Sequence, residues 1–200
     1  MLVVCFEGCH GSGKTALVQR FKELGFQVLD EAFLNMPRSP LPPQSLVMES
    51  IWVSQWIQRI LALALEDGAS EKLYIADRSP YSAEFYADHG HLLRPILDQQ
   101  IQQLHSHGIH VVTVYIKVQT DLLWHRILDR LQREPHRLKY HEDSREWMER
   151  CLRFYDSHHW DFIVANDERS IADTQLDVVS QLKRTEDCSA FFGNPIKAVM

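Results

Sequence analysis

The feature that most constrains the fold of this chain is a glycine-rich turn near its start. The stretch GCHGSGKT, residues 8–15, follows an apolar run over 2–6 and leads into a helical pattern over 14–24. Glycine permits the dihedral angles of a sharp strand-to-helix turn and lets backbone N–H groups approach an anion closely. The stretch therefore predicts a phosphate-binding loop between a buried strand and the N-terminus of a helix.

The polar positions of this loop fit a nucleoside triphosphate and Mg²⁺. Gly8, Gly13, Lys14 and Thr15 match the pattern G-x-x-x-x-G-K-[ST]. We expect Lys14 to face solvent and to supply a mobile positive charge to the β and γ phosphates, while the Thr15 hydroxyl ligates Mg²⁺. The side chains at the variable positions receive no role of their own. The predicted nucleotide-binding loop comprises Gly8, Cys9, His10, Gly11, Ser12, Gly13, Lys14 and Thr15.

Apolar runs and helical patterns alternate along the rest of the chain. The runs are almost continuously hydrophobic, which is typical of strands covered on both faces by helices. We therefore predict an α/β fold, a three-layer α/β/α sandwich around a five-stranded parallel sheet. The predicted strands are 2–6, 26–30, 72–77, 109–118 and 161–166, and the predicted helices are 14–24, 45–66, 80–88, 93–107, 120–133, 143–157 and 171–184.

Length and composition predict a single domain. Two hundred residues with 45% hydrophobic content suffice for one well-buried core. We expect the domain to span 1–184, with a mobile helical lid at about 126–144 and a proline-rich loop on the substrate side at 35–45. The segment 185–200 has no clear hydrophobic period, so it is expected to pack loosely or to be disordered.

Charge and cysteine content narrow the expected partners. A net charge of −6 argues against a nucleic acid polymer or an anionic membrane as the main partner. No apolar run approaches the roughly 20 residues of a membrane span, and the start has no signal-peptide pattern. The four cysteines show no C-x-x-C pair, so we expect reduced thiols in a cytoplasmic protein and no zinc site. A small molecule is the expected partner, and a homodimer remains open.

The residues that follow the predicted strands are candidates for catalysis, since ligands of parallel α/β sheets bind beyond the carboxyl ends of the strands. Asp30 and Glu31 follow the second strand, where a carboxylate can accept the proton of an attacking hydroxyl. Asp77 and Arg78 follow the third strand, where the acid can hold Mg²⁺ and the arginine can contact a phosphate or substrate oxygen. The alternatives are a surface acidic pair and a simple turn capped by Ser79.

Three arginines of the predicted helix 120–133 are candidates for contacts with the triphosphate. Arg126, Arg130 and Arg133 are spaced by four and three residues, which places them along one side of a helix that leads into the lid. Arginines that close over a triphosphate stabilise charge on the transferring phosphoryl group and exclude water. A solvated basic helix face is the alternative.

Weaker signals point to residues around the substrate and the base of the nucleotide. Trp52 and Trp56 share one face of the predicted helix 45–66, and most such aromatic stripes are core. Beside a phosphoryl-transfer site, Trp52 and Gln55 could instead stack on and pair with a nucleobase, and Arg59 could orient a sugar or phosphate. Asn166, after the last strand, is expected to line the adenine pocket.

Taken in order, these segments resemble the deoxynucleoside kinases, within the wider thymidylate-kinase-like P-loop kinases. The resemblance lies in FEGCHGSGKT, the carboxylate after the second strand, DRSPYS, and HRILDRLQRE followed by HEDSREWM, over about residues 2–167. It implies a P-loop kinase fold with ATP and Mg²⁺ as cofactors. It also implies that Glu31 is the base toward the sugar 5′-hydroxyl, and that Asp77 and Arg78 handle metal and phosphate. Arg126 and Arg130 then correspond to the lid arginines.

The expected activity is transfer of a phosphoryl group from ATP to the 5′-hydroxyl of a (deoxy)nucleoside. A nucleoside monophosphate kinase is the nearest alternative, because a hydroxyl acceptor needs a base whereas an ionised phosphate acceptor needs arginines. Glu31 favours the nucleoside, while Arg38 and Arg59, if they converge, favour the monophosphate. A GTP-dependent switch is disfavoured, since the chain has no Asn-Lys-x-Asp stretch.

Overall fold

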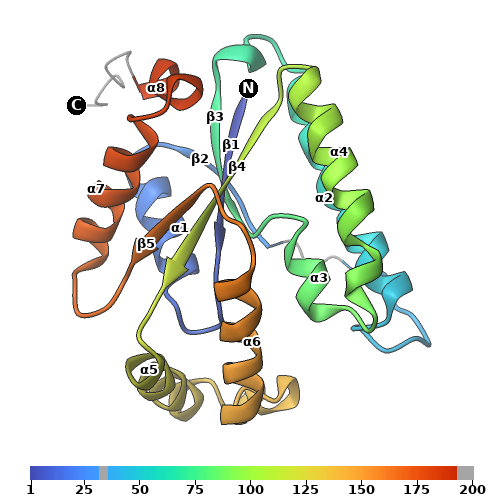
Figure 1. Ribbon diagram of the computed structural model, residues 1–200, viewed down its shortest axis with the longest axis vertical. Coiled ribbons are helices and arrows are strands. Elements are labelled where there is room, and N and C mark those ends of the chain that lie inside the picture. Colours follow the sequence, from blue (N-terminus) through green and yellow to red (C-terminus); the bar gives the residue numbers. More distant parts are fainter. Residues whose placement is uncertain (32–35, 193–200) are drawn as a thin grey trace.

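The computed structural model describes residues 1–31 and 36–192, and its centre is a five-stranded sheet. The strand order is β2-β3-β1-β4-β5, and all neighbouring strands are parallel (Figure 1). The predicted α/β class with a five-stranded parallel sheet is therefore confirmed. The strands are β1 Leu2–Glu7, β2 Gln27–Leu29, β3 Leu73–Asp77, β4 His110–Lys117 and β5 Phe162–Ala165.

The central place of β1 follows from its sequence, LVVCFE. All six of its residues are buried, as expected for a strand with neighbours on both edges and helices on both faces. Leu2 lies opposite Leu73 of β3 on one edge and opposite His110 of β4 on the other. The glycine-rich loop that follows β1 consequently begins in the middle of the sheet, between the ends of β3 and β4.

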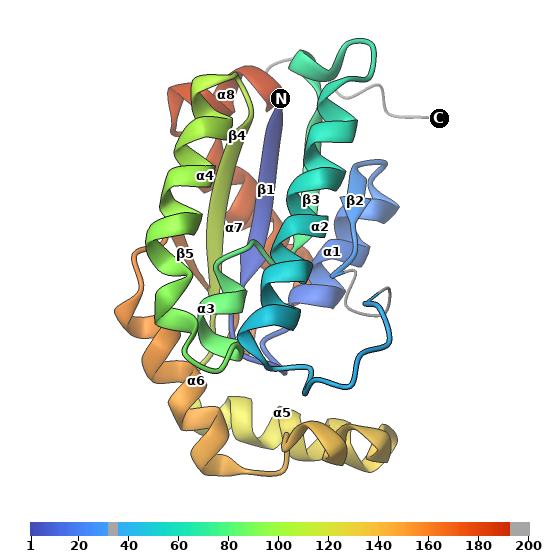
Figure 2. The same ribbon diagram turned by 90° about the vertical axis from the view of Figure 1, so that its right-hand side faces the viewer.

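Helices cover both faces of the sheet (Figures 1 and 2). On one face, Phe21 and Val178 pack with Phe6 of β1 in one buried cluster. On the other face, Trp52 and Leu97 belong to a second buried cluster. The first face carries α1 Lys14–Glu23 and α7 Ile171–Leu182, and the second carries α2 Leu46–Ala64, α3 Ser82–Tyr86 and α4 Arg94–Ser106, with short 3₁₀ turns at Ala69–Glu71 and Gly90–Leu92.

Helices α5 (Thr120–Arg133) and α6 (Arg145–Ser157), with the 3₁₀ helix η4 (Pro135–Tyr140) between them, lie at the carboxyl end of the sheet. Figures 1 and 2 both show α5 and α6 at the end of the molecule opposite the N-terminus. Their apolar sides form a third buried cluster around Tyr115 of β4. The segment predicted as a lid, 126–144, thus lies on the side where the glycine-rich loop emerges.

The prediction for the C-terminal segment needs a correction. Residues Glu186–Phe192 form helix α8, and Cys188 within it is 2% exposed in the cluster that contains Val178 and Leu182. Cys188 and Phe191 are three residues apart, so a helix brings both to the same side, where they reach this cluster. The remainder of the predicted tail, 193–200, and the first residue of the proline-rich loop lie outside the described residues. Within the described ranges, no helix is long and apolar enough to span a membrane.

Candidate active site

The glycine-rich loop has a backbone that only glycine fits at two motif positions. Gly8 has a φ of 143°, and a Cβ atom there would lie 2.8 Å from the carbonyl oxygen of Ile116. Gly13 has a φ of 96°, and its Cβ would lie 2.6 Å from the Nδ2 atom of Asn166. A side chain at either position would be strained and would collide with neighbouring groups. The loop therefore keeps the tight turn that phosphate binding requires.

Lys14 does not face solvent, contrary to our expectation. Its side chain is buried, and its Nζ atom donates hydrogen bonds to the carbonyl oxygens of Gly8 at 2.6 Å and Cys9 at 2.9 Å. Burial, together with the nearby Arg78 charge, lowers the pKa of Lys14. The correction has a simple cause: an ammonium group inside the loop can satisfy its charge with the loop's own carbonyl oxygens. To reach a phosphate, Lys14 has to exchange these partners.

Thr15 and Asp77, the predicted Mg²⁺ ligands, are in direct contact. The Thr15 hydroxyl donates to Oδ2 of Asp77 at 2.9 Å. The start of α1 and the end of β3 thus bring two possible oxygen ligands together. Hydroxyl and carboxylate oxygens are hard ligands of the kind that Mg²⁺ prefers. Close by in the loop, the buried Oγ atom of Ser12 has no hydrogen-bond partner among the described residues. These residues fit a nucleotide with Mg²⁺.

Arg78 is the centre of the polar network at the end of β3. It has a φ of 79°, an unusual value for a large side chain and one that clusters at functional sites. Its Nε atom donates to Oε1 of Glu31 at 2.5 Å. Two tyrosine hydroxyls accept from its guanidinium group, that of Tyr155 at 3.2 Å and that of Tyr86 at 3.0 Å. The network holds Arg78 and Glu31 as one unit.

The structure distinguishes the two carboxylates that follow β2. Asp30 has an 80% exposed side chain and pairs with Arg59 at 3.0 Å. Glu31 instead contacts Arg78, and 42% of its side chain remains exposed. Burial raises the pKa of Glu31, but the charges of Arg78 and Lys14 outweigh burial and lower it overall. Glu31 is therefore the ionised carboxylate that belongs to the Arg78 network.

Glu7 is a residue of this network that the sequence analysis missed. It is fully buried at the end of β1, and its carboxylate accepts hydrogen bonds from the Ser79 backbone and hydroxyl, both at 2.7 Å, and from the Ser82 hydroxyl at 2.8 Å. The Tyr155 hydroxyl also donates to it, at 3.1 Å. Its position directly before Gly8 was the available signal. Glu7 fixes the turn that carries Asp77 and Arg78.

Two tryptophans of α2 anchor the backbone of the site. The Nε1 atom of Trp52 donates to the carbonyl oxygen of Glu31 at 3.0 Å, and that of Trp56 donates to the carbonyl oxygen of Arg78 at 3.3 Å. Both rings are buried in the core. Trp52 thus belongs to the core, so the expectation that it stacks on a nucleobase is replaced by a positioning role. Gln55 lies half-buried on the same helix.

Asn166 lies beneath the glycine-rich loop. Its Nδ2 atom donates to the carbonyl oxygen of Ser12 at 2.8 Å, and its Oδ1 atom accepts from the Thr174 hydroxyl at 3.1 Å. Both ends of its buried amide bond to protein groups, and its place in the adenine pocket stays a prediction. In this structure Asn166 joins the loop to the end of β5.

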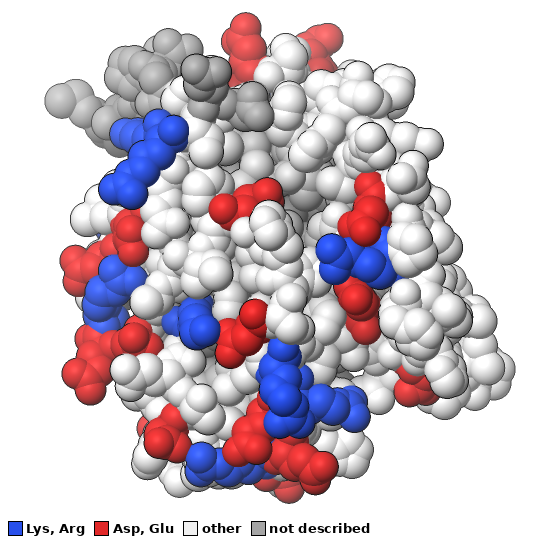
Figure 3. Space-filling view, viewed as in Figure 1, with Lys and Arg blue, Asp and Glu red and all other residues white. Residues whose placement is uncertain are grey.

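Within the part of the chain that the structure describes, the arginines of α5 form no hydrogen bond or ion pair with the glycine-rich loop. Arg126 donates to the carbonyl oxygens of Asn166, at 2.8 Å, and Asp167. Arg130 pairs with Glu134 at 3.2 Å, and Arg133 bonds to a backbone carbonyl oxygen of its own helix. Figure 3 shows positive and negative side chains gathered together at this end of the molecule.

Arg137, in η4, is a further cation near the site that the sequence analysis did not single out. It forms ion pairs with Glu134 at 2.5 Å and with Glu142 at 2.7 Å. Its charge also contributes to lowering the pKa of Glu31. Arg130 and Arg137 thus share Glu134 as an ion-pair partner, and the charge of Arg137 reaches the Glu31 carboxylate.

Glu49 is a second buried acid that the sequence analysis missed. It lies on α2 with 2% of its surface exposed, and its Oε1 atom has no hydrogen-bond partner among the described residues. Burial raises its pKa to about 8, with Arg78 opposing and Glu31 adding to the shift. At neutral pH Glu49 is therefore mainly protonated beside the Arg78 network.

This raised pKa predicts a pH dependence of stability that Glu49→Gln should remove. Between 4.5, the ordinary pKa of glutamate, and about 8, the unfolded chain releases the Glu49 proton while the folded chain keeps it. Wild-type stability should therefore fall as pH rises through this window, by up to about 5 kcal/mol. Urea unfolding at about pH 5, 7 and 9 should show the Glu49→Gln variant gaining on the wild type as pH rises. The exposed Glu146→Gln is the control, and a pH-independent difference would contradict the assignment.

The glycine-rich loop with its lysine follows the central strand β1, and an acid lies at the end of the neighbouring strand β3. This arrangement defines a P-loop nucleotide-binding α/β protein. The chain belongs to the family described as AAA domain, whose model matches residues 3–173. Among curated proteins, none matches the sequence significantly.

Solved structures extend this assignment at the level of the fold. The structure of deoxyadenosine kinase from M. mycoides, with the products dCMP and a flexible dCDP bound, has a TM-score of 0.57 and 16% sequence identity. The match covers 92% of this chain and 100% of that chain. At this identity the likeness shows the fold, and the predicted P-loop kinase fold is confirmed.

Proposed function

We propose that the chain is an ATP- and Mg²⁺-dependent kinase that phosphorylates the 5′-hydroxyl of a (deoxy)nucleoside. The observation that carries this proposal is the contact chain from the glycine-rich loop to a carboxylate. Thr15 contacts Asp77 at 2.9 Å, and the next residue, Arg78, contacts Glu31 at 2.5 Å. A carboxylate that is able to act as a base therefore lies beside the residues that suit the metal and the phosphates.

The loop residues bind and orient the donor nucleotide in this proposal. Backbone N–H groups at the start of α1 face the phosphates, and Lys14 exchanges the carbonyl oxygens of Gly8 and Cys9 for phosphate oxygens. Thr15 and Asp77 would hold Mg²⁺, which would supply positive charge to the phosphates.

Glu31 then takes the proton of the acceptor hydroxyl. Its Oε1 atom is engaged by Arg78, so the other carboxylate oxygen accepts the proton as the bond from the sugar oxygen to phosphorus forms and ADP leaves. The lowered pKa of Glu31 keeps the carboxylate ionised at neutral pH. Arg78 orients the carboxylate and offers its positive charge to the transferring group.

The positions of Arg38 and Arg59 favour a hydroxyl over a phosphate as the acceptor. Arg59 donates to the backbone oxygen and the carboxylate of Asp30, at 3.1 and 3.0 Å. Arg38 is exposed in the proline-rich loop. Among the described residues, neither has a hydrogen bond or ion pair to the Arg78 network. The products bound in the M. mycoides structure, dCMP and dCDP, make deoxynucleosides the first class to test.

The test is ADP release from ATP and Mg²⁺ with a panel of nucleosides and their 5′-monophosphates. We expect turnover with at least one nucleoside and background release with the monophosphates. Turnover with monophosphates alone would replace the proposal by a monophosphate kinase. Background release with the whole panel would contradict both activities.

The lid arginines should matter mainly in the ligand-bound state. Arg130→Ala is expected to lower turnover by about 10²-fold, because an arginine that meets phosphoryl charge in the transition state acts there and not in the ground state. The affinity for ATP, measured by calorimetry, should change much less. Arg133→Ala is the matched control, because Arg133 lies on the same helix and its Nε atom donates to the backbone oxygen of Asp129. Turnover of Arg130→Ala within about twofold of the wild type would mean that Arg130 belongs to a solvated helix face.

A further inference from the structure

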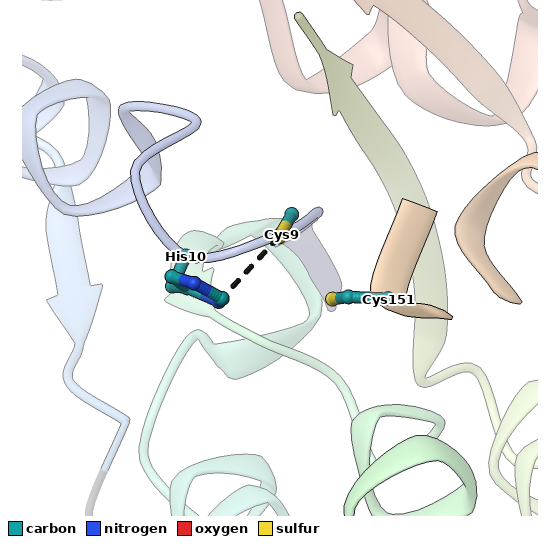
Figure 4. A group of neighbouring side chains, drawn as sticks. All are labelled: Cys9, His10 and Cys151. Carbon is teal, nitrogen blue, oxygen red and sulfur yellow. Dashed lines mark hydrogen bonds between the residues drawn. The ribbon is translucent and has the colours of Figure 1, made fainter. Parts of the chain in front are cut away.

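Two cysteines and a histidine from distant parts of the sequence meet beside the glycine-rich loop. Cys9 and His10 belong to the loop itself, and Cys151 comes from α6 (Figure 4). Their ligand atoms, two sulfurs and an imidazole nitrogen, all lie within 4.8 Å of one another. All three residues are buried. The mechanism proposed above uses none of these side chains.

We propose that Cys9, His10 and Cys151 form a binding site for a thiophilic divalent metal ion of the zinc class. Two thiolates and an imidazole form a borderline-soft ligand set, which suits Zn²⁺ and disfavours Mg²⁺. Thr15 and Asp77 offer only oxygen atoms, so the two sites differ in the metal they prefer. Three protein ligands also match zinc sites that keep a fourth, exchangeable ligand.

The distances fit such an ion without rebuilding the loop. Around a tetrahedral zinc with bonds of about 2.3 Å to sulfur and 2.0–2.1 Å to nitrogen, the sulfur–nitrogen separation is about 3.5 Å and the sulfur–sulfur separation about 3.8 Å. The Sγ atom of Cys9 lies 3.4 Å from Nδ1 of His10. Since no pair of ligand atoms in the group exceeds 4.8 Å, shifts of about 1 Å suffice.

Burial and charge also favour an ion at this place. All three residues are more than nine-tenths buried, so an ion between them would be shielded from water. Two thiolates balance the charge of a divalent ion, and their protons leave to solvent on binding. A disulfide between Cys9 and Cys151 would leave the imidazole of His10 without a role.

The ion would join the glycine-rich loop to α6. Cys9 also accepts the Lys14 hydrogen bond through its backbone, so a metal bond to its sulfur braces the loop next to its lysine. We therefore expect Zn²⁺ at hundredfold excess over its Kd to raise the Tm by about 5–10 °C.

The test is titration of the full, reduced chain with Co²⁺, an optical substitute for Zn²⁺. We expect one Co²⁺ per chain with a thiolate-to-cobalt charge-transfer band, which Zn²⁺ then abolishes by displacement. Cys9→Ala and Cys151→Ala should each lose the band, and Cys188→Ala should keep it. If Cys151→Ala does not fold, His10→Asn, a change in the loop, should weaken binding at least about tenfold.

The proposal fails if the reduced wild type gives no thiolate band, or if Cys9→Ala gives the same band as the wild type. It also fails if thiol titration finds Cys9 and Cys151 joined as a disulfide and the reduced protein binds no Co²⁺. Because the readout is metal binding and not phosphoryl transfer, the proposal stands or falls separately from the kinase activity.

Discussion

Replacing Lys14 with alanine should reduce phosphoryl transfer by about 10³-fold or more. In the structure its ammonium group lies within the loop, bonded to the carbonyl oxygens of Gly8 and Cys9, and it is the loop's only side-chain cation of permanent charge. Alanine removes the charge that contacts the β and γ phosphates. The rate of ADP release at saturating nucleoside measures the loss.

The fold should survive this change at a modest cost. Alanine leaves two loop carbonyl oxygens without the lysine donor, which costs about 1–3 kcal/mol. The loop stays anchored by the hydrogen bond from Asn166 to Ser12, so circular dichroism should remain native. Lys183→Ala, an exposed lysine just after α7, is the control. Activity above a few per cent of wild type in a folded Lys14→Ala protein would refute a catalytic role for this loop.

Glu31→Gln should lower turnover with a nucleoside by ~10²–10⁴-fold while ATP still binds. Glutamine keeps the size of the side chain and can still meet Arg78 through its amide oxygen, but it cannot accept the proton of a sugar hydroxyl. The change therefore removes the proton-accepting role of Glu31 and keeps its hydrogen bond with Arg78, which is 2.5 Å long. Single-turnover kinetics with prebound ATP separate the chemical step from binding.

Asp30→Asn is the matched control, because Asp30 precedes Glu31 and pairs with Arg59 at the surface. We expect it to keep near wild-type turnover. If Asp30→Asn causes the large loss and Glu31→Gln does not, the base has been assigned to the wrong neighbour. If neither change affects nucleoside phosphorylation, no carboxylate after β2 acts as base.

The sheet and the ends of its strands were predictable because they follow from local patterns. Continuous apolar runs identified the buried strands, and the carboxyl-end rule for parallel sheets selected Asp77, Arg78 and Glu31 in advance. Thr15 and Asp77 meet as the motif predicts, since their places on neighbouring elements are fixed by the register of β1 and β3.

Interactions between distant segments were not predictable from those patterns. Glu7 directly follows the predicted strand 2–6, but only the packing of Tyr155 and Ser82 against it reveals its role. Lys14 turns inward because of loop carbonyl oxygens that no spacing rule describes. Cys9 and Cys151 come together only through the fold, so counting C-x-x-C pairs could not find them.

The buried acid and the short C-terminal helix illustrate the same limit. The sequence does not show whether Glu49, within its helix, is buried or exposed. Its pKa depends on its burial beside Arg78. Helix α8 has too few residues for a hydrophobic period, and its place against α7 gives Cys188 a buried environment. Tertiary packing decides both cases.

The most direct test of the central claim is to find where the γ-phosphoryl group of ATP goes. Wild-type protein is incubated with γ-labelled ATP, Mg²⁺ and either an active nucleoside or its 5′-deoxy analogue, which lacks the acceptor hydroxyl. If the chain phosphorylates the nucleoside 5′-hydroxyl, the label is found in the nucleoside 5′-monophosphate and none is transferred to the analogue. Label on the analogue, label found only in inorganic phosphate, or transfer to added monophosphates but never to a nucleoside would contradict this activity.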